Sequence, residues 1–146
     1  MNTIGGILTN KCVWLPFLCW LCIQIFKFLV ELIRTKKVNF KRLMGAGGMP
    51  SSHSAVVTCL AVLVGKADGF GSSTFAIAAV LASVVMYDAA GIRRAAGKQA
   101  HLLNKIVETP NLTNVQVQER LTEVLGHTPI QVFVGAAIGI VVGILF

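Results

Sequence analysis

The residues best suited to chemistry lie in the stretch Gly-Gly-Met-Pro-Ser-Ser-His-Ser, residues 47–54, which leads into an apolar segment. Glycine at Gly48 lets the backbone approach an anion closely, and proline suits the first positions of a helix. Ser51 or Ser52 can cap the first amides, where the helix dipole favours negative charge. His53 would then face a bound phosphate and could exchange a proton as an ester is cleaved. The alternative is that these residues only start a helix and that His53 bonds a neighbouring backbone group.

A second histidine stands in a similar place, because His127 comes directly before Thr128-Pro129 and another apolar segment. Thr128 as cap, Pro129 in the first helical position and Gln131 in the third make a capping-box pattern. Gln131 is also one turn from His127 and could orient its imidazole. Two histidines beside two helix N-termini are suited to the nucleophile and the acid of phosphoryl transfer.

Other charged residues lie within or at the ends of apolar segments. Lys27 and Glu31 are one turn apart, so either they form an ion pair with each other or Lys27 faces a site inside a helical bundle. Asp88 comes shortly before Arg93 and Arg94. It either forms an ion pair with one of them or positions an arginine or a histidine for catalysis.

The composition assigns these groups to a membrane protein. Of 146 residues, 55% are hydrophobic and only 13% are charged, and the mean hydropathy is +0.74, far from an average soluble domain. The first apolar segment has no small-residue cleavage site after it and should stay in the mature chain. We expect one domain covering residues 1–146, an all-α polytopic transmembrane bundle of four, or at most five, membrane helices. Its four apolar segments are residues 13–33, 52–67, 74–90 and 130–146.

Alternate crossing of the bilayer would gather the polar groups at one face. If residues 1–11 form a polar lead on side B, the connectors 35–50 and 91–126 lie on side A, together with both histidines. Ten of the 13 basic residues then lie on side A, which predicts that side A is cytoplasmic. The net charge of +7 also suits anionic membrane lipids, and we expect no nucleic-acid partner.

Two further patterns concern packing. In the second connector, five apolar residues predict an amphipathic helix against the membrane surface or the other connector. In the last apolar segment, glycines recur every fourth residue and allow another helix to approach closely. That helix belongs either to the same chain or to a second copy in a homodimer. The apolar residues of the connector are Val115, Val117, Leu121, Val124 and Leu125. The glycines of the last apolar segment are Gly135, Gly139 and Gly143.

Three stretches resemble the divergent branch of the type 2 phosphatidic acid phosphatase superfamily, which is related to the vanadium haloperoxidases. They are residues 47–55, residues 86–94 (Met-Tyr-Asp-Ala-Ala-Gly-Ile-Arg-Arg) and residues 125–129 (Leu-Gly-His-Thr-Pro). They occur in the family's order and extend over nearly the whole chain. The chain departs from the family's motifs at Thr35, which replaces a proline, at Ser52, which replaces a glycine, and at Gln131, which replaces an acid.

The resemblance implies a role for each residue. His127 would form a phosphohistidine, His53 would protonate the leaving alcohol, and Gln131 or Asp88 would support the imidazole. Without a metal or cofactor, Lys27, Arg34, Arg93 and Arg94 would hold the phosphate oxygens, in addition to Gly48, Ser51 and Ser52 of the glycine-rich turn.

The expected function is therefore metal-independent hydrolysis of a lipid phosphate or pyrophosphate in the cell membrane, with the site at the cytoplasmic face. A catalytically weak protein that only binds lipid phosphate is one alternative, favoured by Gln131. A membrane scaffold without enzymatic activity is the other. The sequence does not distinguish among phosphatidate, phosphatidylglycerophosphate and polyprenyl pyrophosphate as the substrate.

Overall fold

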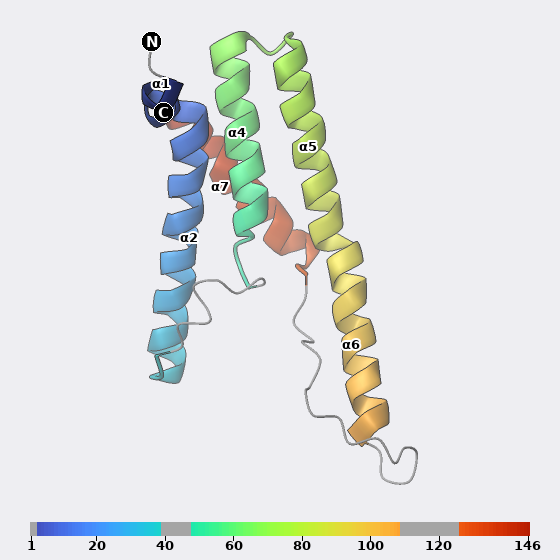
Figure 1. The fold of residues 1–146 in the computed structure, drawn as a ribbon. Coiled ribbons are helices and arrows are strands. Elements are labelled where there is room, and N and C mark those ends of the chain that lie inside the picture. Colours follow the sequence, from blue (N-terminus) through green and yellow to red (C-terminus); the bar gives the residue numbers. More distant parts are fainter. Residues whose placement is uncertain (1–2, 39–47, 109–125) are drawn as a thin grey trace.

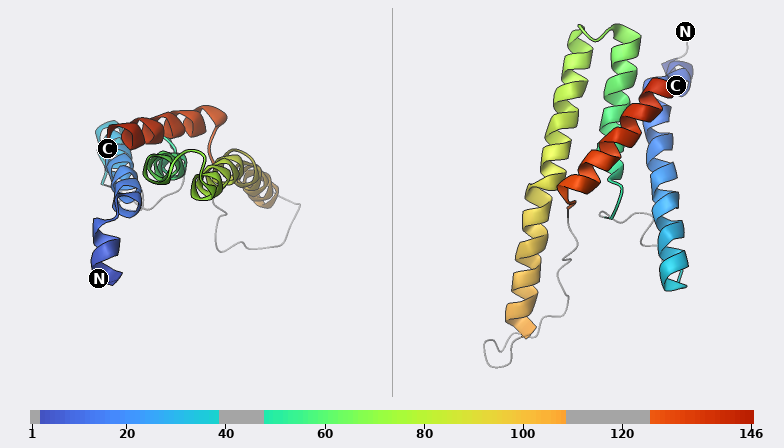
Figure 2. Two further views of the ribbon diagram at one scale, coloured as in Figure 1. Left: turned by 90° about the horizontal axis from the view of Figure 1, so that it is seen from above. Right: turned by 180° about the vertical axis from the view of Figure 1, so that it is seen from behind.

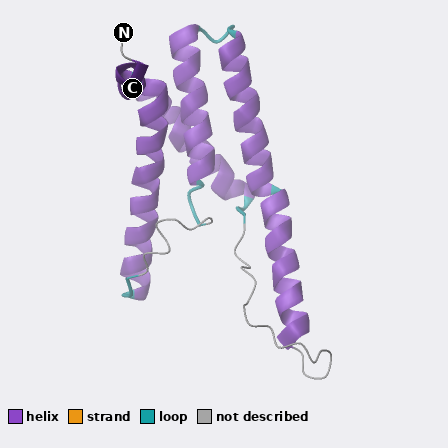
Figure 3. Ribbon diagram, in the orientation of Figure 1, coloured by secondary structure: helices purple, strands orange, loops and turns teal. Residues whose placement is uncertain are grey.

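The computed structural model describes residues 3–38, 48–108 and 126–146, and these residues form helices without any strand (Figures 1 and 3). The all-α prediction is therefore confirmed for this part of the chain. The predicted amphipathic helix at residues 115–125 lies outside the described residues. The helices are α1 (Thr3–Thr9), α2 (Lys11–Thr35), α4 (Ser52–Asp68), α5 (Ser73–Ala90), α6 (Ile92–Glu108) and α7 (Pro129–Leu145).

Each of the four apolar segments forms one helix, because each has both apolar side chains and a local start signal. Asn10 caps α2 by accepting a hydrogen bond from the Cys12 amide at 2.9 Å. Helix α2 ends where Lys36 adopts a left-handed conformation with φ of 53°. The N-terminal lead differs from the prediction, because residues Thr3–Thr9 form a short helix of their own.

Two helical stretches are long and apolar enough to cross a membrane: α2, and the stretch Ser73–Ile106, which combines α5 with most of α6. Helices α4 and α7 have 17 residues each, below the roughly 20 that cross a bilayer directly. By length, the described chain thus holds two candidate spans, and four crossings remain a prediction.

Helix α4 is the centre of the bundle. It packs against α2 on one side and α5 on the other, while α7 crosses it obliquely (Figure 2). The helices alternate in direction, so the N- and C-termini lie at the same end and α4 and α7 both begin at the other end (Figure 1). This arrangement agrees with the predicted threading. The end where α4 and α7 begin corresponds to side A.

The closest packing is between α4 and the glycine face of α7. A Cβ added at Gly135 would collide with the carbonyl oxygen of Ser51, and one added at Gly139 would collide with Ala55 and Thr58. Because the two helices are this close, the Thr58 hydroxyl can donate a hydrogen bond to the Ala136 carbonyl oxygen, at 3.1 Å. Small residues and such hydroxyl bonds are what hold helices together in lipid.

The same packing bears on the two alternatives for the glycine face. Gly135, Gly139 and Gly143 all lie against α4 of the same chain. Contact within one chain therefore accounts for these glycines in the described residues, and a homodimer through them stays a prediction.

At side B, two lysines hold the end of α7. The Lys66 ammonium donates to the carbonyl oxygens of Gly143 and Ile144 at 3.2 and 2.9 Å. Lys11 donates to the Phe146 carbonyl oxygen at 3.5 Å. Cations are favourable at a helix C-terminus, so both lysines have a structural role at this end.

Candidate functional site

The N-terminus of α4 is built by buried serines. Ser51 is the cap, and its hydroxyl accepts hydrogen bonds from the amide and the hydroxyl of Ser54 at 3.3 and 2.9 Å. Ser51 is fully buried and Ser52 is 3% exposed. Gly48 has φ of 79°, a conformation that favours glycine.

Pro50 differs from the prediction in its place. It lies one residue before the cap, outside the helix, and its peptide bond with Met49 is cis. The helix begins later because Ser51 is fixed as the cap. Its backbone amide bonds to α7 and its side chain bonds to Ser54.

The N-terminus of α7 has the predicted capping box. The Thr128 hydroxyl accepts from the Gln131 amide at 3.4 Å, and the Gln131 side-chain oxygen accepts from the Thr128 amide at 3.0 Å. The side chain of Gln131 therefore already stabilises the helix terminus.

Two backbone hydrogen bonds connect the stretches 47–55 and 86–94 with the start of α7, one through Gln131 and one through His127 of the stretch 125–129. The Ser51 amide donates to the Gln131 carbonyl oxygen at 3.0 Å, and the His127 amide donates to the Ala89 carbonyl oxygen at 3.0 Å. The start of α4, the start of α7 and the end of α5 thus meet at one place. Because helix N-termini carry partial positive charge, two of these three ends favour an anion.

A polar cavity of about 700 Å³ opens beside this junction, on the side of α2. Lys27 and Arg34 contribute two positive charges and Glu31 one negative charge, so the lining is net positive. Lys27 is 5% exposed, whereas Arg34 is exposed at the end of α2. The lining residues are Lys27, Val30, Glu31, Arg34, Thr35, Gly48, Met49 and Gln131.

Of the predicted catalytic groups, only Gln131 lines this cavity. His127 is 3% exposed, and its backbone amide bonds to the carbonyl oxygen of Ala89, the residue after Asp88 in the last turn of α5. His53 is exposed on the first turn of α4. Neither histidine lines the polar cavity described above. Arg93 and Arg94 lie in the first turn of α6, which follows α5 directly.

Two groups of site residues can therefore be distinguished at this end of the bundle. The α2 side holds the cavity with Lys27, Arg34, Gly48 and Gln131, and the α5 side holds His127 and Asp88. Sequence reasoning did not assign Glu31 to the cavity. Its spacing gave a signal, because residues 27, 31 and 34 recur on one face of a helix.

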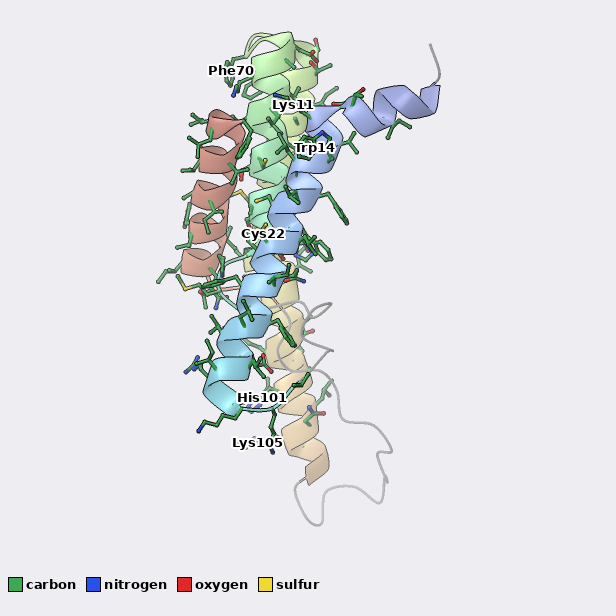
Figure 4. The ribbon with its side chains drawn as sticks, turned by 90° about the vertical axis from the view of Figure 1, so that its left-hand side faces the viewer. Lys11, Trp14, Cys22, Phe70, His101 and Lys105 are labelled. Carbon is green, nitrogen blue, oxygen red and sulfur yellow. The ribbon has the colours of Figure 1, made fainter. Side chains whose placement is uncertain are left out.

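Helix α6 continues beyond the ends of α4 and α7 (Figure 1). His101 and Lys105 lie along it, away from the α4–α7 junction (Figure 4), and both are exposed. Among the described residues, no group of three or more histidine, cysteine or acidic side chains is placed to share a metal ion.

Comparison with known proteins gives two matches. The model of the divergent PAP2 family matches residues 8–142. The chain is 40% identical to the uncharacterized membrane protein YuiD of Bacillus subtilis (strain 168), in an alignment that covers 80% of this chain and 81% of that protein. No solved structure matches the chain. The matched residues include all three stretches that meet at side A, and the chain belongs to the divergent PAP2 family.

Proposed function

We propose that this protein is a membrane-bound, metal-independent phosphatase for a lipid phosphate or pyrophosphate. The observation that supports this most is the pair of backbone hydrogen bonds, from Ser51 to Gln131 and from His127 to Ala89. They bring together stretches that lie far apart in the sequence, at an end where two helix N-termini favour a phosphate.

In the proposed reaction, Lys27 and Arg34 hold the phosphate oxygens from the α2 side. The imidazole of His127 attacks phosphorus and the bond to the lipid oxygen breaks, while His53 gives its proton to the leaving alcohol. Water then attacks the phosphohistidine, His53 takes a proton from that water, and inorganic phosphate leaves. The two histidines must both reach the phosphate for this sequence, so the polar cavity and the α5 side would act on one substrate.

Binding without turnover is the second candidate, and two observations favour it. The side-chain oxygen of Gln131 is engaged in the cap of α7, and neither histidine lines the polar cavity. A neutral amide also stabilises an imidazolium less than a carboxylate does. In this case the protein would hold a lipid phosphate at side A without cleaving it.

An assay of the purified full chain distinguishes the two candidates. Phosphatidate, phosphatidylglycerophosphate and polyprenyl pyrophosphate are each supplied in mixed micelles with a chelator, and phosphate release is measured with and without vanadate. A phosphatase should release phosphate in the presence of chelator and be inhibited by vanadate. Release that requires an added divalent metal would contradict the mechanism. Saturable binding of a lipid phosphate without release of phosphate would support the binding candidate instead of the phosphatase.

For the cellular location, we propose a multi-pass protein of the cell membrane whose site faces the cytoplasm. The support is the two candidate spans, the relative that is named a membrane protein and the excess of basic residues on side A.

A further inference from the structure

An apolar groove of about 870 Å³ runs between α2 and α7. Its wall on α2 extends from Trp14 near the start of the helix to Val30 near its end, and Ile138 contributes from α7. Trp14 and Cys22 lie on this length of α2 (Figure 4). None of the described residues that line the groove is charged.

The groove is adjacent to the polar cavity at side A, because Val30 and Met49 line both spaces. A positively charged pocket next to an apolar groove is complementary to an amphiphile with an anionic head. The head would lie in the pocket and the chain in the groove.

The length of the groove bears on the kind of chain. From Trp14 to Val30, α2 rises about 24 Å at roughly 1.5 Å per residue. One leaflet contributes about 15 Å of hydrocarbon, half of the core thickness of roughly 30 Å. A chain that fills the groove from side A therefore passes the bilayer midplane, which an ordinary chain confined to one leaflet does not.

We infer that the groove holds the single long hydrocarbon chain of the same lipid whose phosphate or pyrophosphate occupies the polar cavity. The inference rests on the proposed function for the binding of the headgroup, and it adds where the hydrocarbon chain of the lipid lies. It selects a long-chain phosphate of the polyprenyl type over diacyl phosphates, because the far end of the groove lies beyond the midplane.

Trp14 provides a reporter at the far end of the groove. The chain has two tryptophans. The other one, Trp20, stacks on Phe17 with ring centroids 5.6 Å apart and does not line the groove. A Trp20→Phe variant therefore leaves Trp14 as the single fluorophore.

The test measures quenching of Trp14 in phosphatidylcholine vesicles that contain a small fraction of a single-chain lipid phosphate with bromine at the chain end. A chain long enough to span the groove should quench several-fold more than the same fraction of chain-brominated phosphatidylcholine. A short-chain phosphate with terminal bromine should show no such excess. The Trp14→Phe variant, which keeps only Trp20, should respond equally to all three lipids.

A matched pair of substitutions tests the groove itself. Cys22→Phe places a ring in the groove and should abolish the excess quenching. Leu21→Phe adds the same kind of ring at an exposed position that does not line the groove and should leave the excess unchanged. Loss of the excess in both variants, or in neither, would overturn the assignment.

Because quenching reports chain occupancy and not turnover, the inference and the proposed function can fail separately. Excess quenching without phosphate release would support a long hydrocarbon chain in the groove, and it would favour binding of the headgroup without turnover. Phosphate release from long-chain and diacyl substrates at equal kcat/KM, without excess quenching, would support the phosphatase and overturn the long-chain groove.

Discussion

Gln131 contributes to two features of the molecule. Its side-chain oxygen completes the capping box of α7, and the residue also lines the polar cavity. Glutamate is an equally good partner at this position of a capping box. A carboxylate can therefore be introduced one turn from His127 without loss of the cap.

Gln131→Glu should raise kcat if His127 becomes cationic during the reaction. A gain of about tenfold corresponds to roughly 1.4 kcal/mol of added stabilisation in the transition state. The same charge repels phosphate in the cavity and should raise KM, so the two constants must be measured separately in the micelle assay. Thr128→Ala is the control, because it weakens the cap by about 1 kcal/mol and adds no charge. A higher kcat in both variants would mean that the effect comes from the helix terminus and not from the added charge.

The three histidines of the chain offer a second comparison at the residue scale. His127→Ala should abolish both turnover and any trapped phosphoenzyme, because the covalent intermediate has nowhere to form. His53→Ala should reduce turnover by about a hundred- to ten-thousand-fold, the usual effect of losing a general acid. A substrate with a good leaving group should recover part of that loss, because it needs little protonation.

His101→Ala is the matched control for both substitutions, since His101 is exposed on α6 and should leave turnover unchanged. Each variant is first compared with the native chain by thermal unfolding in detergent, which matters most for the buried His127. A phosphohistidine trapped in the His127→Ala variant would contradict the assignment of the nucleophile.

At the scale of elements, α7 positions the site through its contact with α4. The Ser51 carbonyl oxygen lies against Gly135, and the Ser51 amide bonds to the carbonyl oxygen of Gln131. The packing of the glycine face thus fixes where Gln131 and the α7 N-terminus lie. A change far from the cavity, but within this interface, should therefore affect both stability and the site.

Gly139→Ala should lower the free energy of unfolding by about 1–3 kcal/mol, the usual cost of overpacking. The reason is that the added Cβ would collide with the carbonyl oxygen of Ala55 and the hydroxyl of Thr58. Thermal unfolding in detergent measures the effect. Gly71→Ala is the control, because nothing lies within 4 Å of a Cβ at that position. Equal unfolding midpoints for both variants would contradict the close contact between α4 and α7.

At the scale of the whole molecule, local signals predict the helices and tertiary contacts decide the rest. The apolar runs and the cap at Thr128 are local, and they specify where the helices lie and where α7 begins. That Gln131 lines the polar cavity and His127 does not depends instead on how α7 crosses α4. No spacing in the sequence encodes that crossing. Pro50 was misplaced for the same reason, because a bond from α7 helps to fix Ser51 as the cap.

The charge distribution around the bundle makes a prediction for its orientation in the membrane. Lys11 and Lys66, two of the three basic residues outside the side-A connectors, are bonded to the carbonyl oxygens at the end of α7. Their charge is partly neutralised by the helix dipole. The basic connectors therefore dominate the asymmetry, and side A should be cytoplasmic.

Single cysteines at residues 2 and 111 test the orientation, in a background in which Cys12, Cys19, Cys22 and Cys59 are replaced. Both positions lie outside the described residues. If α2, α4, α5 and α7 each cross the bilayer, Asn2→Cys should react with an impermeant maleimide added to intact cells. Asn111→Cys should react only after the membrane is opened. Reaction of both from the same side would reject the four-crossing threading, and reaction of Asn111→Cys alone in intact cells would reverse the orientation. In the reversed case the polar cavity would face outward, and a phosphatase at that face would act on lipid phosphates of the outer leaflet.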